Sequence, residues 1–501
     1  MSEPPRLLRR WVFALLAATL AALSLWQLER AASGVTIERL TVGPTPVTRF
    51  AARGADGPAV VIAHGFAGSR QMMRAYALGL AQAGYVAWAF DFEGHGRHPV
   101  PMSGDVTEVE GTTQLLVDQT LSVVEAAAAR DGGGRPVALV GHSMATDIII
   151  RAALRDDATG PATGPVVAIS AFSQAVTPQA PDNLLLISGQ GEPGLRDFAL
   201  RALRMVDPQA QEGETATAGD ISRRAVVAPG VEHVAVLWSR TAQAEAVDWL
   251  NLAHGREAAP PVPRYGAWLG ALLAALVALA LPLSRLLPAR AEPRTTLPPR
   301  RFAAAVLLPA LLAPLVSVPV DLGALPVLVA DYLAVHLLVF GAVQLALLWR
   351  LGVLPGRISA LAVAALLIWG LGAFGMALDR YGANFWPTPE RGWIIAALAL
   401  GAVPFMLADA LVTAGGHAPF WQRITARVAF LASLGVAVAL DFERLFFLML
   451  IAPVIVLFYL VFGLMGRWAA QRAGAAGAGL GLGLVLAWAL GVSFPLFAAG
   501  G

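Results

Sequence analysis

The sequence predicts two structural classes in one chain: an α/β domain with a mostly parallel sheet, and an all-α bundle of transmembrane helices. Hydrophobic residues make up 57% of the chain and charged residues only 14%, whereas an ordinary soluble domain has about 25% charged residues. Long apolar runs gather in residues 265–501, while strand-like and helix-like segments alternate in residues 30–256. That alternation is typical of parallel strands joined by helices that cover both faces of a sheet.

The N-terminal segment predicts a transmembrane anchor over residues 1–29. Three arginines precede the apolar stretch Trp11–Leu28, which is about long enough to cross a bilayer as a helix. The alternative is a signal peptide cleaved near the small residues Ala31-Ala32-Ser33. Both interpretations export the segment that follows.

Residues 30–256 carry the predicted α/β domain. Strands are expected at 36–42, 46–52, 58–63, 85–91, 136–141, 166–170, 184–188 and 224–228. Helices are expected at 69–83, 112–130, 143–155, 194–206 and 236–253. Two of the strands, 58–63 and 136–141, are short continuous apolar runs, as expected of strands buried on both faces.

A Pro-rich linker at 257–264 separates this domain from a polytopic transmembrane domain of about eight helices over 265–501. The apolar spans lie at 266–284, 302–322, 325–349, 358–378, 393–413, 427–440, 445–466 and 474–497. The span at 427–440 is short. Three ionisable residues, Asp331, His336 and Asp409, fall inside apparent spans, where such groups usually mark a pathway or form hydrogen bonds between helices.

The distribution of arginine predicts the orientation in the membrane. With a cytoplasmic N-terminus, the cytoplasmic loops would be 285–301, 350–357, 415–427 and 467–472, and each contains at least two arginines. The opposite loops mix acidic and basic residues, which agrees with the positive-inside rule. We therefore expect an integral protein of a bacterial inner membrane, with residues 30–256 on the extracytoplasmic side.

The strongest chemical signal is Gly141-His142-Ser143-Met144-Ala145, which directly follows a predicted strand and precedes a predicted helix. This segment resembles the nucleophile elbow of the α/β-hydrolase family, with Ala145 where the pattern usually has glycine. The resemblance covers residues 40–250 and implies an α/β-hydrolase fold with Ser143 as nucleophile. An ordinary strand-to-helix turn with a buried serine is the alternative.

Two further segments resemble the same family. After the strand at 58–63, His64-Gly65 looks like the oxyanion segment, which implies that the backbone N–H groups of Phe66 and Met144 stabilise the oxyanion. His95 lies in a segment that has a structural role in the family, so we expect it to be part of the scaffold.

A serine nucleophile needs a base, and the base needs an acid that orients it. The family's chain order of Ser, acid and His implies Glu192 as acid, three residues after Gly189, and His233 as base after the last strand. Asp182, Asp197 and His254 are less well placed for these roles.

The sequence therefore predicts a membrane-bound serine hydrolase that cleaves a lipid-like or envelope carboxylic ester through an acyl-enzyme. No cofactor or metal is expected, and the absence of cysteine excludes thiolate catalysis. The expected partners are a lipid-like or ester small molecule and the lipid bilayer; the net charge of +2 argues against nucleic acid. Only about a dozen residues separate two late strands where a cap domain is often inserted, so an uncapped site is expected.

Three alternatives remain open at this point: an acyltransferase, a peptidase or thioesterase that uses the same triad, and a transporter or sensor with a non-catalytic hydrolase-like domain. The sequence leaves the oligomeric state open.

Overall fold

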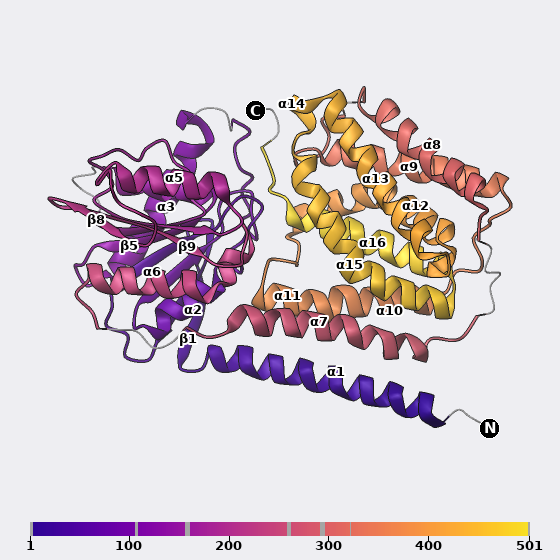
Figure 1. The fold of residues 1–501 in the computed structure, drawn as a ribbon, viewed down its shortest axis with the longest axis horizontal. Coiled ribbons are helices and arrows are strands. Elements are labelled where there is room, and N and C mark those ends of the chain that lie inside the picture. The colour runs from indigo at the N-terminus through magenta and orange to yellow at the C-terminus, as the bar shows by residue number, and fades with distance from the viewer. Residues whose placement is uncertain are drawn as a thin grey trace. The chain divides into compact units, whose positions relative to one another are not determined.

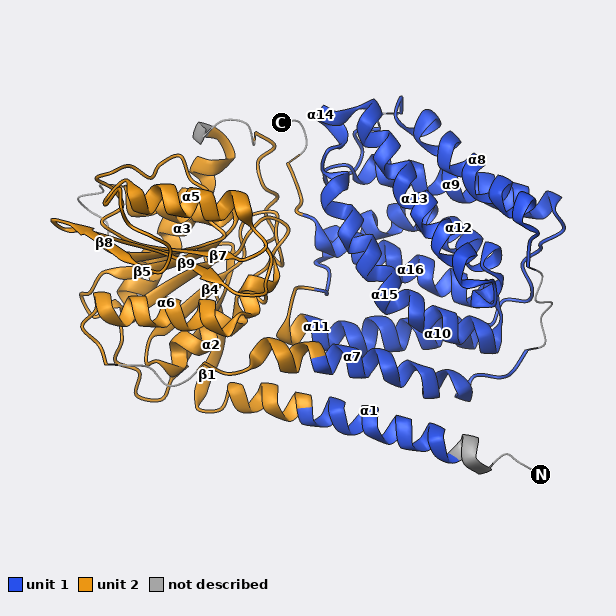
Figure 2. Ribbon diagram, in the orientation of Figure 1, with its two compact units in different colours: residues 1–23, 271–378, 385–494 blue, residues 24–270, 379–384, 495–501 orange. Residues whose placement is uncertain are grey.

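A computed structural model describes residues 4–105, 109–155, 161–257, 262–290, 296–320 and 322–498. The chain forms two compact units (Figure 2). The sheet unit contains residues 24–270, 379–384 and 495–501, and the helical unit contains residues 1–23, 271–378 and 385–494. Half of the predicted linker, residues 258–261, lies outside the described residues.

In the sheet unit, the described residues form one nine-stranded sheet in the order β1-β2-β4-β3-β5-β6-β7-β9-β8 (Figure 1). The strands are β1 (Val35–Val42), β2 (Thr45–Ala52), β3 (Ala59–Ala63), β4 (Val86–Phe90), β5 (Val137–His142), β6 (Thr163–Ile169), β7 (Asn183–Gly189), β8 (Thr215–Ala218) and β9 (Ile221–Ala228). The strands from β4 to β9 in this order pair in parallel, and β2 and β8 pair antiparallel with their neighbours at the two edges. The sheet is therefore mostly parallel, as predicted.

Helices cover both faces of this sheet (Figure 1). They are α2 (Arg74–Gln82), α3 (Gln114–Ala127), α4 (Met144–Ala153), α5 (Pro193–Arg204) and α6 (Arg240–Ala253). Helices α2 and α6 lie on one face, and α3 and α5 on the other. Because β3, β4 and β5 are covered on both sides, every residue in them is buried.

Two local predictions in the sheet unit differ from the structure. The edge strand β8 was not predicted, because its sequence Thr-Ala-Thr-Ala lacks the large apolar residues that indicate a strand. The helix expected over 236–253 is divided into a short 3₁₀ turn, Ala235–Trp238, and α6. Ser239 lies between them in extended conformation, and its hydroxyl caps α6 by accepting the Ala242 N–H.

The remaining helices are α1 (Pro4–Ala31), α7 (Tyr265–Leu283), α8 (Pro299–Ser317), α9 (Ala330–Arg350), α10 (Ala360–Leu366), α11 (Gly375–Tyr381), α12 (Gly392–Val412), α13 (Phe420–Leu440), α14 (Phe442–Leu445), α15 (Leu448–Ala473) and α16 (Ala475–Ser493). A π-helical stretch, Leu367–Phe374, joins α10 to α11. Nine helical segments among the described residues are long and apolar enough to cross a membrane. They include the N-terminal segment Leu8–Ala31.

The sequence placed several arginines in loops that the structure places in helices. Helix α13 has 21 residues and is therefore longer than the span predicted at 427–440. Most of its first two turns, which contain Arg423 and Arg427, was left out of the predicted span because of these charges. Arg467 and Arg472 likewise lie within α15 rather than in a loop. The apolar run ended at these charges, but the helix did not.

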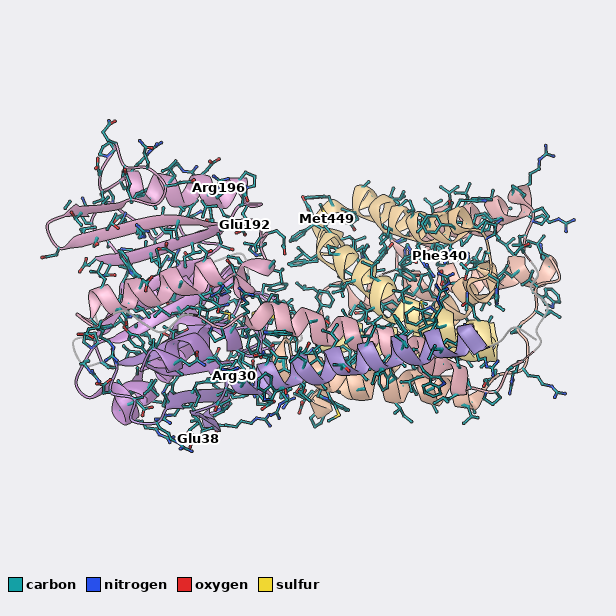
Figure 3. The ribbon with its side chains drawn as sticks, turned by 60° about the horizontal axis from the view of Figure 1, so that its bottom comes forward. Arg30, Glu38, Glu192, Arg196, Phe340 and Met449 are labelled. Atoms are coloured by element: carbon teal, nitrogen blue, oxygen red, sulfur yellow. The ribbon has the colours of Figure 1, made fainter. Side chains whose placement is uncertain are left out.

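The three ionisable residues of the apparent spans have partners within the helical unit. Asp331 lies in the first turn of α9 and accepts the Leu325 N–H of the preceding loop at 2.9 Å. The Nε2 atom of His336 lies 3.1 Å from the Ser433 hydroxyl on α13. His336 is one turn before Phe340, which is labelled in Figure 3. These contacts support the interpretation that the groups form hydrogen bonds between and next to helices.

Asp409, the third ionisable residue within a span, forms an ion pair with Arg427 at 3.4 Å. This ion pair links α12 to α13.

Candidate active site

Ser143 lies at a sharp bend between β5 and α4. Its backbone has φ 53° and ψ −121°, a conformation that residues with a side chain rarely adopt. A side chain at Gly141 would come within 2.8 Å of Ile149 and 3.0 Å of the Ala145 carbonyl oxygen. The close approach of strand and helix thus requires glycine at this position, and the bend presents the serine hydroxyl at the carboxyl end of β5.

His233 connects Ser143 to Glu192 in one line of hydrogen bonds. Its Nε2 atom lies 2.9 Å from the Ser143 Oγ atom, and its Nδ1 atom lies 2.6 Å from Glu192 Oε1. Glu192 is the residue before α5, one turn before Arg196, and Figure 3 labels both. The structure therefore brings together the three side chains that the sequence assigned to a triad.

The Glu192 carboxylate is fixed by two more donors. Its Oε2 atom accepts the Gly189 N–H at 2.6 Å and the Ser170 hydroxyl at 2.8 Å. Burial alone would raise the pKa of Glu192, but the hydrogen bonds from His233, Gly189 and Ser170 outweigh it, so the pKa is lowered. The carboxylate stays ionised and can hold a proton on the facing nitrogen of His233.

The loop of the acid and the loop of the base are joined through their backbones. The Gly191 N–H donates to the Val231 carbonyl at 2.9 Å, and the Gln190 N–H donates to the Ala228 carbonyl at 2.9 Å. The Gln190 side chain accepts the Gly230 N–H at 2.8 Å. These bonds fix the position of the imidazole relative to the carboxylate before any substrate binds.

His142 forms a hydrogen bond to the backbone of the loop that carries His233. Its Nε2 atom donates to the backbone carbonyl of His233 at 2.8 Å. Burial and the neighbouring His233 lower the pKa of His142 to about 4, so the ring is neutral at ordinary pH and its proton is on Nε2. His142 belongs to the serine motif, but the sequence indicates no role for it, because this contact joins residues 91 positions apart.

The segment His64-Gly65-Phe66 packs against the bend of Ser143. A side chain at Gly65 would come within 3.0 Å of the Ser143 Cβ atom. The Gly65 carbonyl accepts the Gly68 N–H at 3.0 Å and is 2.8 Å from His64 Nδ1. Because His64 Nε2 accepts the Phe92 N–H, the His64 proton is on Nδ1 and is donated to this carbonyl.

These bonds fix the plane of the Gly65–Phe66 peptide, and so the direction of the Phe66 N–H, which points away from the carbonyl in a trans peptide. Met144 is the first residue of α4. Its N–H is one of the donors that a helix cannot satisfy within itself. Met144 therefore directly follows Ser143, and Phe66 directly follows Gly65, which packs against Ser143.

The other candidate residues named from the sequence lie outside the line of hydrogen bonds formed by Ser143, His233 and Glu192. The Nδ1 atom of His95 is 2.8 Å from the Glu93 carbonyl, and its ring packs near Phe66, as expected of a scaffold residue. Asp182 precedes β7, at the end of that strand opposite to Glu192, and Asp197 is exposed on α5. His254 follows α6 and packs near Tyr85.

The site is open. The His233 side chain is 43% exposed, whereas Glu192 is 4% exposed. No helix is present between β6 and β7, where a cap would be inserted, and every residue of that connection is described. Phe172 in this connection is exposed, and its carbonyl lies next to Thr146 in the first turn of α4. Beside His233, Val234 is also exposed.

Among the residues described, no group of three or more His, Cys, Asp or Glu side chains could hold a metal ion. Ser170 is a residue of the site that was not predicted from the sequence. Its position at the end of β6, beside the strand that leads to Glu192, is the signal that could have indicated it.

Comparison with known proteins gives one family match. Residues 56–198 match the family model described as serine aminopeptidase, S33. The sheet unit has the α/β-hydrolase fold. A search of curated proteins gives no match.

Three solved structures illustrate the similarity of the α/β-hydrolase domain. A predicted CIB-like hydrolase from Thermoplasma acidophilum is 14% identical, with 44% of this chain and 98% of that chain covered and a TM-score of 0.34. A soluble variant of monoglyceride lipase from Saccharomyces cerevisiae is 12% identical, with 44% of this chain and 96% of that chain covered and a TM-score of 0.31. A membrane phospholipase A described as a bacterial virulence factor is 16% identical, with 48% of this chain and 93% of that chain covered and a TM-score of 0.33. At these identities and scores, neither activity nor substrate is transferred to this chain.

Proposed function

We propose that this protein is a membrane-bound serine hydrolase that cleaves carboxylic esters through a Ser143-His233-Glu192 triad. The observation that carries the proposal is the continuous line of hydrogen bonds from Ser143 Oγ through the imidazole to the buried carboxylate. A serine hydroxyl becomes a useful nucleophile only when a base accepts its proton in this way.

In the proposed reaction, His233 accepts the proton of Ser143 as the Oγ atom attacks the acyl carbonyl. The N–H groups of Phe66 and Met144 would stabilise the oxyanion, and each such donor contributes about 3–4 kcal/mol to transition-state binding. His233 then donates the proton to the leaving alcohol, and water releases the acid by the same steps in the second half. Glu192 keeps the imidazole in the required tautomer.

An ester with an apolar acyl group fits the open site best. The exposed Phe172 and Val234 provide apolar surface beside the first turn of α4 and beside His233. A peptide substrate is the second candidate, because the family that the chain matches is described as a serine aminopeptidase.

Labelling and turnover test this proposal on the purified full chain in detergent. A fluorophosphonate probe is expected to label the natural protein and not Ser143→Ala, while Ser122→Ala, which removes an exposed serine of α3, is expected to be labelled normally. Short-chain p-nitrophenyl esters are expected to be hydrolysed much faster than aminoacyl p-nitroanilides. Labelling of Ser143→Ala at the natural level contradicts the triad, and faster anilide cleavage favours the peptidase.

We further propose that the N-terminus is cytoplasmic and the α/β-hydrolase domain extracytoplasmic, in a bacterial inner membrane. Nine candidate spans and the positions of the arginines support this topology. Because the chain has no cysteine, single cysteines can report it. Ser33→Cys is expected to react with an impermeant maleimide in intact cells, and Leu354→Cys only after permeabilisation. The reverse pattern contradicts the topology.

A further inference from the structure

The sheet unit has a cavity whose chemistry the proposed reaction does not use. It has a volume of about 490 Å³ and lies between β1, β2, the start of α2 and the segment 379–384. Five arginines and one acidic residue line it: Arg39, Arg70, Arg74, Arg97, Arg380 and Asp379. Such a concentration of guanidinium groups around one cavity is costly unless something compensates for the charge.

Three of the five arginines are neutralised within the unit. Arg97 pairs with Asp379 at 2.6 Å, and Arg380 pairs with Glu29 at 2.8 Å. Arg70 pairs with the fully buried Asp91.

The other two, Arg39 and Arg74, form no ion pair of their own with any acidic residue that the structure describes. Arg74 hydrogen-bonds to the Tyr265 hydroxyl, and the carboxylate near it, Glu29, is the one already paired with Arg380. Arg39 is exposed on the edge strand β1, and the Arg74 guanidinium lies 5.7 Å from the centre of the Phe50 ring. The cavity and its paired carboxylates therefore have a net charge of +2.

The position of the cavity indicates what could supply the missing negative charge. Arg380 lies in the last turn of the candidate span Ala360–Tyr381, and Glu29 lies in the last turn of the candidate span Leu8–Ala31. Their ion pair joins the ends of the two spans beside the cavity. Figure 3 labels Arg30 and Glu38 on either side of the junction where the first of these spans leads into β1. The end of a membrane span is at the depth of lipid headgroups.

We propose that this cavity binds the phosphate group of an anionic phospholipid. Guanidinium groups have planar sets of donors that match phosphate oxygens, and arginine is favoured where such recognition matters. Arg39 and Arg74 provide the uncompensated charge, and Arg97 and Arg380 the polar rim. The inference rests on the proposed membrane location and not on the esterase chemistry.

Lipid binding by the full chain tests the proposal. The protein is purified in a non-ionic detergent as Ser143→Ala, so that no lipid is turned over, and is titrated with dihexanoyl phosphatidylglycerol, dihexanoyl phosphatidylcholine or inorganic phosphate. The cavity variant is Arg39→Gln/Arg74→Gln. The matched control, Arg53→Gln/Arg201→Gln, removes two exposed arginines that do not line the cavity.

Phosphatidylglycerol is expected to bind at least tenfold more weakly to the cavity variant and with unchanged affinity to the control. Phosphatidylcholine and inorganic phosphate are expected to bind weakly to all forms. Equal affinity of phosphatidylglycerol for both variants overturns the site, and inorganic phosphate bound as tightly as the lipid overturns the lipid as its source.

Two measurements keep the result independent of folding and of the topology. Thermal unfolding compares the two double variants, and the single change Arg39→Gln, at an exposed position, is expected to weaken phosphatidylglycerol binding about threefold by itself. If the cysteine experiment contradicts the membrane topology while the lipid still binds, the phosphate site stands and the topology does not.

Discussion

Replacing Glu192 by glutamine tests the triad more sharply than removing the serine, because the change preserves shape and alters only the pattern of donors. The Oε2 atom of Glu192 accepts the Gly189 N–H, which cannot rotate, at 2.6 Å. The amide oxygen of a glutamine must therefore take the Oε2 position. Its NH₂ group then faces His233 Nδ1, which is 2.6 Å from Oε1 in the natural protein.

A donor in that position forces the wrong tautomer on His233. The Nδ1 atom must accept a hydrogen bond, so the proton moves to Nε2, which faces the Ser143 hydroxyl and can no longer accept its proton. The opposite rotamer of the glutamine would restore the tautomer, but it would turn the amide NH₂ toward the Gly189 N–H, which costs about 1–3 kcal/mol. In either rotamer the neutral amide also lacks the negative charge that stabilises the imidazolium. In serine proteases the equivalent change lowers kcat about 10⁴-fold.

For Glu192→Gln we therefore expect kcat to fall about 10³–10⁴-fold, which corresponds to about 4–5.5 kcal/mol of barrier. The assay is hydrolysis of a short-chain p-nitrophenyl ester by the purified full chain, with kcat and KM measured separately. Asp197→Asn is the matched control, since it makes the same chemical change at the exposed acidic residue of α5 and should leave kcat unchanged. A fall of less than tenfold for Glu192→Gln refutes the reasoning.

Four further changes probe the surroundings of the triad. Ser170→Ala removes one donor from the Glu192 carboxylate and is expected to lower kcat about 10-fold, because a hydrogen bond to a charged group contributes about 1.5–3 kcal/mol; an unchanged kcat would show that Gly189 suffices. His142→Phe removes the support of the His233 carbonyl and is expected to lower kcat with little change in KM, whereas a rise in KM alone would point to a role in binding. Gly96→Ala is expected to lower the melting temperature by several degrees, because Gly96 has φ +53° and a Cβ atom there would overlap the Asp91 carboxylate; an unchanged melting temperature would contradict this packing. The free energy of unfolding of the sheet unit is expected to fall between pH 6.5 and pH 4 by about 1.4 kcal/mol per pH unit for each of two buried histidines, and His142→Gln should reduce that slope.

The sign of the last prediction follows from the two protonation equilibria. Burial lowers the pKa of His64 and His142 to about 4 in the folded protein. In the unfolded chain a histidine titrates near its ordinary value of about 6.5. As the pH falls below 6.5 the unfolded chain binds protons that the folded protein excludes, so protonation favours unfolding until the pH reaches about 4. A denaturation midpoint that does not change over this range would contradict the burial of both rings.

The residues that the sequence placed near one another were those whose position depends on topology. In a parallel sheet, Ser143 after β5, Glu192 after β7 and His233 after β9 all lie at the same edge, so their order along the chain is sufficient. The contacts of His142 with the His233 carbonyl and of Ser170 with Glu192 depend instead on side-chain directions, which no pattern along the chain specifies. The sequence could therefore predict the triad as a hypothesis, but not the residues that support it.

Where the helical prediction was wrong, the reason is the treatment of charge. A span predicted from hydrophobicity ends where the first arginine is met. The predicted span was therefore only 427–440, although α13 begins at Phe420. Arg427 remains within the helix because Asp409 on α12 pairs with it at 3.4 Å and its guanidinium lies 4.6 Å from the Tyr459 ring. A charge near the end of a span is tolerated when a carboxylate or an aromatic face compensates for it. The partners come from other helices, so the length of such a span is a property of the packed unit and not of the local sequence.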